Sequence, residues 1–156
     1  MNGDMIKKEL IELDFDVKNQ NDYFKKISER LQSLGYVRDT FLNAILIREE
    51  NFPTALPLEP YIVAIPHVEP EHVIKPFIAA SRLKNPIEWR EMAANENVLS
   101  TKFVFMLGFL EYTDHVNLLQ VLIENFQKPE LMDKLINAKE KDEFMKALME
   151  IDYSIV

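Results

Sequence analysis

A chain of 156 residues, 47% hydrophobic and 28% charged, has the length of one domain and the composition of a globular protein, which argues against disorder. Its formal net charge of −8 argues against a nucleic-acid binder and means that any phosphate site must supply positive charge locally. The chain has no cysteine, which excludes disulfides, cysteine nucleophiles and thiolate metal sites. No apolar run approaches the ~20 residues of a membrane span. We therefore expect a cytoplasmic protein without membrane insertion.

The first predicted elements are a strand and two helices. The first ten residues lack the apolar core of a signal peptide, and a loose alternation over residues 9–15 predicts an edge strand. Apolar residues at helical spacing predict an amphipathic helix over residues 21–34, with Gly35 as its C-cap. A second helix is predicted over residues 38–50, and Pro53 ends it.

The middle of the chain carries the apolar runs that predict a sheet. A continuous apolar run at residues 61–65 is typical of a buried strand, and Pro66 ends it. A proline-rich loop is expected before this strand, over residues 53–60, and a polar loop after it, over residues 67–75. The other predicted strands are 77–83, 102–110 and a short edge strand over 87–90.

The last third of the chain is predicted to be helical. The strongest helix covers residues 114–127, with Thr113 or Asp114 as its N-cap and an inner stripe that includes Leu119 and Leu122. Two short helices follow, over 129–137 and 141–149. Strands and helices are interleaved, so we expect an α/β fold: one domain over residues 1–156, with a small mixed central sheet flanked by helices.

Several common kinds of site can be excluded from the residues present. The three glycines are far apart, so Walker-type and dinucleotide-binding loops are absent. No serine lies in a G-x-S-x-G elbow. The three histidines, His67, His72 and His115, have no spacing typical of a zinc site.

His67 has the most suggestive local setting of the three. It follows the predicted buried strand and Pro66, whose ring fixes its own φ and restricts Ile65 to an extended form. This predicts a histidine held stiffly at the carboxyl end of a strand, where ligand sites of open α/β sheets gather. A surface-loop histidine with no role is the other interpretation, and the local pattern alone favours it.

Two further residues could support an anion. His115 is predicted in the first turn of the helix over 114–127, facing the inner stripe, beside free backbone N–H groups that favour an anion. A satisfied, half-buried histidine is an equally good interpretation. Arg48 ends the second helix, where its side chain is either a solvated charge or a guanidinium that hydrogen-bonds to phosphate oxygens. His72 lies among charged residues and is interpreted as a surface residue.

Four short motifs occur in a specific order along the chain. Arg48-Glu49 closes a helix, Pro53-Thr54 follows, then come Ala64-Ile65-Pro66-His67 and, later, Asp114-His115. Together with the spacing of the elements, they resemble the enzyme IIA component of the bacterial phosphoenolpyruvate-dependent sugar phosphotransferase system, in its fructose/mannitol/nitrogen-regulatory class. The resemblance runs from about residue 21 to residue 148.

The resemblance implies a fold, a reaction and partners. The fold would be that of fructose/mannitol-type enzyme IIA. His67 would accept a phosphoryl group from the phosphocarrier HPr and pass it to an enzyme IIB, which serves a membrane enzyme IIC. His115 would be the second active-site histidine, and Arg48 would match the family's arginine. No metal or organic cofactor would be needed. Two alternatives stay open: a regulatory module that uses the same phosphohistidine, and a binding domain that has lost phosphorylation.

The chain departs from the family around the active-site loop. Ala55 and Val68 stand where many members have glycine, and Glu59 is only near the position of a glutamate found in some members, so it is given no role. The sequence Val68-Glu69, with His72 beyond it, looks closest to galactitol-type members. Val68 and Val73 beside the His67 loop are expected either to be exposed and form a docking surface or to pack on the domain.

Overall fold

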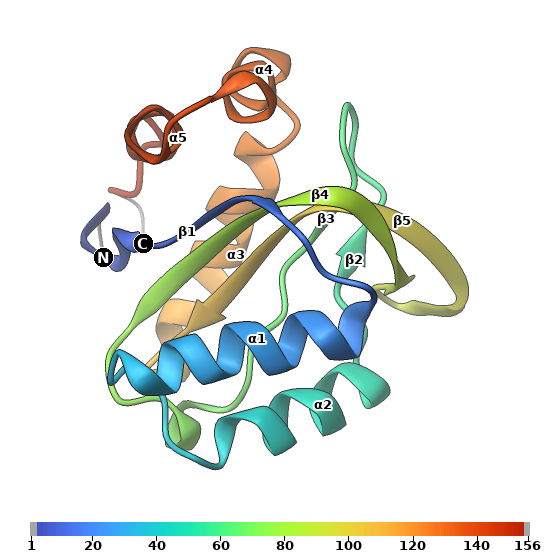
Figure 1. The fold of residues 1–156 in the computed structure, drawn as a ribbon, viewed down its shortest axis with the longest axis vertical. Helices are drawn as coiled ribbons and strands as arrows, with labels where there is room; N and C mark the ends of the chain where they lie inside the picture. The colour runs from blue at the N-terminus through green and yellow to red at the C-terminus, as the bar shows by residue number, and fades with distance from the viewer. Residues whose placement is uncertain (1–2, 155–156) are drawn as a thin grey trace.

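The computed structural model describes residues 3–154, and Figure 1 shows a twisted mixed sheet with helices packed around it. The strands are β1 (Ile6–Phe15), β2 (Ala55–Leu56), β3 (Val63–Ala64), β4 (Phe77–Glu91) and β5 (Ala94–Gly108). The helices are α1 (Gln20–Ser33), α2 (Phe41–Asn51), α3 (Tyr112–Asn125), α4 (Pro129–Asn137) and α5 (Lys141–Met149). Two short 3-10 helices are η1 (Gly3–Met5) and η2 (Pro70–His72). The predicted class, α/β with a small mixed sheet flanked by helices, is confirmed.

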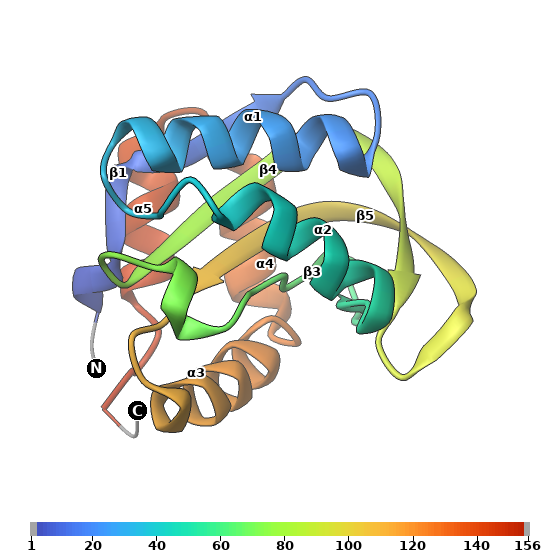
Figure 2. The same cartoon turned by 90° about the horizontal axis from the view of Figure 1, so that it is seen from below.

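The sheet buries one hydrophobic cluster on each face. Along β4, Phe77 and Ala79 belong to one cluster, whereas Ile78 and Ala80 belong to the other, as the two-residue period of a strand requires. Helices α1 and α2 contribute to the first cluster, and α3, α4 and α5 to the second (Figures 1 and 2). The sheet is therefore covered on both faces, and its edges and ends carry the surface that is left for function.

The strand order is β1-β4-β2-β3-β5, and β4 also pairs with β5. β1 runs parallel to β4 at an edge of the sheet, as predicted, and β4 and β5 form an antiparallel hairpin. The short strand β3 runs parallel to β5 and antiparallel to β2. β3 therefore delivers the segment that follows it, with His67, alongside the last residues of β5.

The long β4–β5 hairpin corrects the sequence prediction. The expected separate strands at 77–83 and 87–90 are one strand, and residues 94–101, where no strand is expected from the sequence, begin its partner. The register shifts between Arg82 and Ile87, around Pro86, whose missing N–H interrupts a ladder. Residues 94–101 of β5 are mostly polar and show no clear alternation, so periodicity alone does not reveal this part of the hairpin.

Smaller corrections concern the helix ends and the loop before His67. α1 begins after an Asn19 cap and ends at Ser33 with Leu34 as its C-cap, so the predicted C-cap Gly35 lies one residue beyond, where its φ is +84°. α2 begins three residues later than expected. The loop over 53–60 contains the two-residue strand β2, and the strand expected over 61–65 shortens to β3. α4 and α5 have the predicted bounds.

The start of α3 matters most for the site. The helix begins at Tyr112 with Glu111 as its N-cap, not at Thr113 or Asp114, so His115 is its fourth residue. Its buried side chains are Leu118, Val121, Leu122 and Asn125, and Leu119 is only partly buried. None of the helices within residues 3–154 is long and apolar enough to cross a bilayer.

Candidate functional site

His67 is a buried histidine with a defined tautomer. The backbone N–H of Leu107 in β5 donates to the carbonyl of Pro66 at 2.9 Å, which extends the pairing of β3 and β5 up to His67. The His67 ring is 7% exposed, and its Nδ1 lies 2.9 Å from the carbonyl oxygen of Ile65. A carbonyl can only accept, so Nδ1 carries the proton and Nε2 carries the lone pair. The interpretation of His67 as a surface-loop residue is therefore wrong.

His115 meets His67 directly. The two Nε2 atoms lie 2.8 Å apart, and the ring centroids lie 4.3 Å apart. Because Nε2 of His67 is the acceptor, Nε2–H of His115 is the donor. Phe109 packs beside both rings and supports this arrangement. The prediction that His115 faces inward is confirmed, although the helix begins earlier than expected.

Arg48 approaches the histidines from α2. Its Nη1 donates to Oε1 of Glu69 at 3.0 Å, and its guanidinium lies over the ring of Phe52 at 4.6 Å. Its Nε is buried and has no hydrogen-bond partner within the described part of the chain. An unpaired N–H donor of a charged group at this point suits an incoming anion.

One pocket of about 180 Å³ joins these three residues. Arg48, His67 and His115 all line it, together with Glu111 and Tyr112 at the start of α3. Glu111 makes no side-chain cap, so the first N–H groups of α3 remain available and add the positive end of the helix dipole. Figure 2 shows the green segment that carries His67 running between α2 and α3.

The electrostatics of the pocket keep both histidines neutral near pH 7. The pKa of His67 is lowered to about 4, mainly by burial; the hydrogen bond to Ile65 raises it, and the neighbouring His115 and Arg48 lower it. Burial, followed by the charge of Arg48, also lowers the pKa of His115. His67 therefore presents an unprotonated Nε2 to the pocket, which is the form that can attack an electrophile.

The low pKa of His67 predicts a pH-dependent contribution to stability. The unfolded chain, where histidine titrates near 6.5, binds more protons than the folded chain as the pH falls from about 6.5 towards 4, so the fold loses stability in that window. From pH 7 to pH 5.5, the loss due to His67 should be roughly 1 kcal/mol. Urea unfolding of wild type and His67→Gln at both pH values gives the loss of unfolding free energy for each protein, and the difference between the two losses is the contribution of His67. An equal loss in both proteins would contradict a buried, neutral His67.

Glu49 is a buried residue that the sequence prediction missed. Both N–H and Oγ1 of Thr54 donate to its carboxylate, at 2.8 and 3.0 Å, and Nε1 of Trp89 donates at 2.6 Å. Burial raises its pKa to about 7. These bonds anchor the last turn of α2, which carries Arg48. The signal was present in the sequence, because Glu49 lies four residues after Ile45 on the buried stripe of α2.

Other predicted residues lie outside the pocket. His72 is half-buried and its Nδ1 lies 2.8 Å from Oγ1 of Thr40, so it is not a plain surface residue. Glu59 is exposed and does not line the pocket. Val68 and Val73 are both buried and belong to the cluster under α1 and α2, so the interpretation that they pack on the domain is confirmed and the one that they form a docking surface is wrong.

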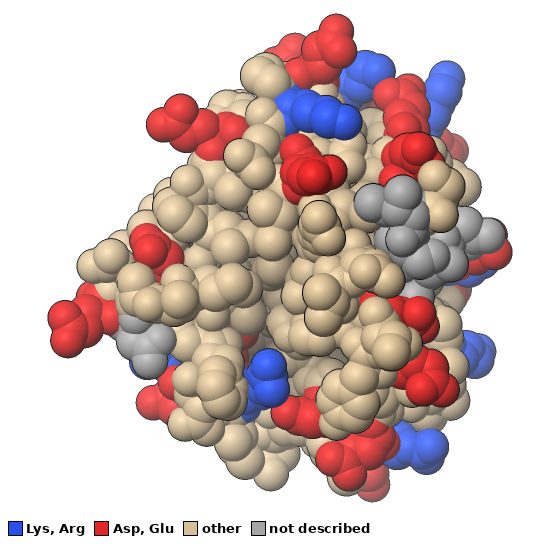
Figure 3. Space-filling model, turned by 180° about the vertical axis from the view of Figure 1, so that it is seen from behind, with Lys and Arg blue, Asp and Glu red and all other residues tan. Residues whose placement is uncertain are grey.

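A different apolar surface surrounds the pocket. Tyr112 and Val116 of α3 are 67% and 64% exposed, and Leu110 precedes them; Ile47 is exposed on α2, and Phe52 is exposed at its C-cap. Figure 3 shows the face on the α3 side as a broad uncharged area with charged side chains mainly around it. Exposed large apolar side chains gathered in this way are typical of a protein-binding surface.

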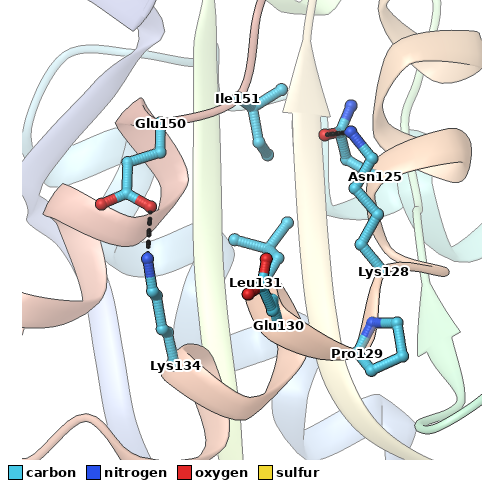
Figure 4. A pocket seen from close by; sticks show the side chains of 8 residues that line it. All are labelled: Asn125, Lys128, Pro129, Glu130, Leu131, Lys134, Glu150 and Ile151. Atoms are coloured by element: carbon cyan, nitrogen blue, oxygen red, sulfur yellow. Dashed lines mark hydrogen bonds and ion pairs between the residues drawn. The ribbon is translucent and has the colours of Figure 1, made fainter.

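The other large cavities formed by the described residues do not contain the histidine pair. A pocket of about 540 Å³ lies between the end of α3 and α4, where Lys128 is hydrogen-bonded to Asn125 and Lys134 to Glu150 (Figure 4). Among the described residues, no group of three or more His, Asp or Glu side chains is arranged to hold a metal ion. The pocket at His67 combines an arginine with two neutral histidines.

Comparisons with known proteins identify relatives along nearly the whole chain. Residues 4–151 match the family model described as "Phosphoenolpyruvate-dependent sugar phosphotransferase system, EIIA 2". The chain is 28% identical over 137 residues to the "PTS system galactitol-specific EIIA component" of Escherichia coli strain K12, a match that covers 86% of this chain and 91% of that protein.

Solved structures share the fold. The nitrogen regulatory protein IIA-Ntr of Neisseria meningitidis superimposes with a TM-score of 0.77 at 21% identity, over 94% of this chain and 97% of that one. The mannitol enzyme IIA in its complex with phosphorylated enzyme IIB from Escherichia coli gives a TM-score of 0.75 at 17% identity, over 93% and 97% of the two chains. At these identities the likeness shows the fold alone.

Proposed function

Since the chain belongs to the EIIA 2 family of the phosphoenolpyruvate-dependent sugar phosphotransferase system, as its motifs predicted, we propose that it is a phosphoryl carrier that holds the phosphate on Nε2 of His67. The observation that carries this proposal is the tautomer of His67. Its Nδ1–H is bonded to the carbonyl of Ile65, so the lone pair on Nε2 faces His115 in a pocket that also contains Arg48.

The reaction follows from this geometry. The Nε2 lone pair attacks phosphorus, an N–P bond forms, and the bond between phosphorus and the donor breaks. No proton leaves Nε2, because it carries none. The ring becomes more positive as the bond forms, and the carbonyl of Ile65 stabilises that charge through Nδ1–H. When the phosphoryl group moves on to an acceptor, the N–P bond breaks and the imidazole ring is the leaving group.

The phosphorylated ring needs partners for roughly two added negative charges. His115 must release Nε2 of His67 when the N–P bond forms, and its N–H can then donate to a phosphoryl oxygen. Arg48 supplies a formal positive charge and the unpaired Nε–H. The start of α3 adds the dipole. These groups stabilise charge on the equatorial oxygens, which is the main task of a protein in phosphoryl transfer.

The test is phosphorylation in a defined system. The purified chain is incubated with phosphoenolpyruvate, enzyme I and HPr, and its intact mass is measured before and after acid treatment. The proposal predicts one added phosphoryl group that depends on HPr and is lost in acid. A chain that gains no phosphate, or gains one that survives acid, contradicts the proposal.

The proposed partners are HPr as donor and an enzyme IIB as acceptor, with a membrane enzyme IIC served indirectly and the exchange taking place in the cytoplasm. Support for an enzyme IIB comes from the mannitol IIA of like fold, whose complex contains one. Similarity to a galactitol-specific EIIA component supports uptake of galactitol or a similar polyol. The regulatory alternative uses the same His67, and the likeness to IIA-Ntr, which shows fold alone, does not favour it.

The apolar surface around the pocket predicts how docking variants behave. Val116→Asp puts a charge at the centre of the proposed contact, so it should weaken binding of HPr and of a IIB domain at least about tenfold. The matched control is Met149→Asp, because Met149 is also exposed, at 51%, but lies on α5, which contributes no described residue to the lining of the His67 pocket. Titration by NMR or calorimetry measures both variants. Equal affinities for the two variants would place the docking surface elsewhere.

A further inference from the structure

Glu69 lies beside the proposed phosphate position with a charge of the wrong sign. It follows His67 by two residues, lines the same pocket, and its Oε1 accepts from Nη1 of Arg48 at 3.0 Å. A hydrogen bond to its own backbone N–H, together with the charge of Arg48, lowers the pKa of Glu69, so the side chain is ionised at neutral pH. The arginine of the pocket is therefore already paired with a carboxylate before any phosphate arrives.

The charges in the pocket walls show why this matters. Arg48 is the one lysine or arginine among the described residues that line the pocket, whereas Glu69 and Glu111 both contribute carboxylates. With both histidines neutral, the side chains of the walls do not offer a net positive charge. The charge of Glu69 also reaches the His67 ring, whose pKa it raises. A phosphoryl group on His67 would feel the same charge as repulsion.

The ion pair itself is a weak contributor to stability. The side chains of Arg48 and Glu69 are 29% and 35% exposed, so solvent screens their attraction. A carboxylate at this position would be a poor choice if the only task were to hold phosphate as tightly as possible. It is a good choice if the phosphate must also be released to the next protein.

We propose that Glu69 is a positioning residue that shares Arg48 with the phosphoryl group and thereby weakens the hold of the site on phosphohistidine. In the empty site Glu69 keeps the guanidinium at the pocket wall. In the phosphorylated site it competes for Arg48 and repels the phosphoryl oxygens. Glu69 thus favours transfer onward to the acceptor. This inference rests on the proposed function and specifies how one residue tunes it.

The test measures the equilibrium between this chain and HPr. Known amounts of phospho-HPr and the unphosphorylated chain are mixed, and the phosphorylated fractions of both proteins are read by mass spectrometry at neutral pH. Glu69→Gln removes the charge at nearly constant shape, so the equilibrium should shift towards phosphorylation of this chain on the order of tenfold. Transfer from the variant to an enzyme IIB should slow correspondingly. Glu69→Asp keeps the charge and should restore most of the wild-type equilibrium.

Glu71→Gln is the matched control. Its side chain is 76% exposed, two residues further along, and pairs with His72 at 3.8 Å instead of Arg48. It removes the same charge from the same segment, so it should leave the equilibrium unchanged. If the wild type takes up phosphate and Glu69→Gln shifts the equilibrium less than about twofold, or no more than Glu71→Gln does, the inference about Glu69 is wrong while the proposed function stands. A wild type that takes up no phosphate overturns both.

A second measurement does not depend on phosphorylation. In the unphosphorylated protein, the Arg48 guanidinium is held by Glu69, so its Nη signals should be resolved by NMR and should broaden or merge in Glu69→Gln. The same signals should be unaffected in Glu71→Gln. Signals of Arg48 that are identical in all three proteins would show that Glu69 does not hold the arginine, and the inference would fail.

Discussion

Replacement of His67 by alanine is expected to abolish uptake of acid-labile phosphate from phospho-HPr. The N–P bond requires a nitrogen lone pair directed into the pocket, and Nε2 of His67 supplies it because Nδ1–H is committed to the carbonyl of Ile65. His115 cannot substitute in the same tautomer, because its Nε2–H is the donor of the pair. The measurement is the intact mass of wild type and variant after incubation with phosphoenolpyruvate, enzyme I and HPr.

The controls separate loss of the nucleophile from loss of the fold. His67 is buried, so the alanine variant must first show a wild-type circular dichroism spectrum and cooperative unfolding, and His67→Gln fills more of the space. His115→Gln should still accept phosphate, although slowly, and His72→Gln should accept it at close to the wild-type rate, since His72 is bonded to Thr40 outside the pocket. Labelling of His67→Ala as complete as that of wild type would remove the basis of the proposed function.

Arg48→Ala should reduce the rate of phosphoryl transfer by about 10²–10³, the range observed when a preorganised donor is removed from a site of developing charge. The effect is large because Arg48 is the one formal cation in the pocket wall among the described residues, and the chain as a whole is acidic. Arg48→Lys should recover part of the rate, because it keeps the charge but loses the planar fork. Single-turnover transfer from saturating phospho-HPr measures the step itself.

A charge-matched variant shows whether position or net charge is responsible. Arg30→Ala removes one positive charge from α1, where Arg30 bonds to Glu9 and Glu12 on β1, and it does not touch the pocket. It should transfer phosphate at nearly the wild-type rate. If Arg48→Ala is no slower than Arg30→Ala, Arg48 does not stabilise the transferred group, and the pocket as described lacks its cation.

Part of the site could be predicted because its signals are local in the sequence. Pro66 stiffens the approach to His67 whatever the rest of the chain does, and Gly35, which has a positive φ, directly follows the C-cap of α1. A histidine at the end of a buried strand can therefore be recognised from the amino-acid sequence alone. The contact between His67 and His115 cannot, since 48 residues separate them and it depends on how α3 packs on the sheet.

The incorrect predictions have physical causes that can be traced to particular residues. Residues 94–101 of β5 pair with β4 through the backbone, but their side chains are mostly polar, so the sequence there has no hydrophobic period to detect. Val68 and Val73 lie in a segment that is otherwise polar, and only tertiary packing shows that both are buried. Glu49 resembles one more member of a charged run, although its spacing from Ile45 places it on the buried face of α2.

The most direct test of the proposed phosphoryl carrier is to locate the phosphate on a single atom. The chain is labelled with ¹⁵N-histidine, phosphorylated through HPr, and examined by NMR at alkaline pH, where the coupling of phosphorus to a ring nitrogen identifies the bonded atom. We predict that the phosphate is bonded to Nε2 of His67, that Nδ1 of the same ring keeps its proton, and that the signals of His115 shift without coupling to phosphorus. Phosphate on Nδ1 of His67, or on His115 or His72, would contradict the proposed mechanism.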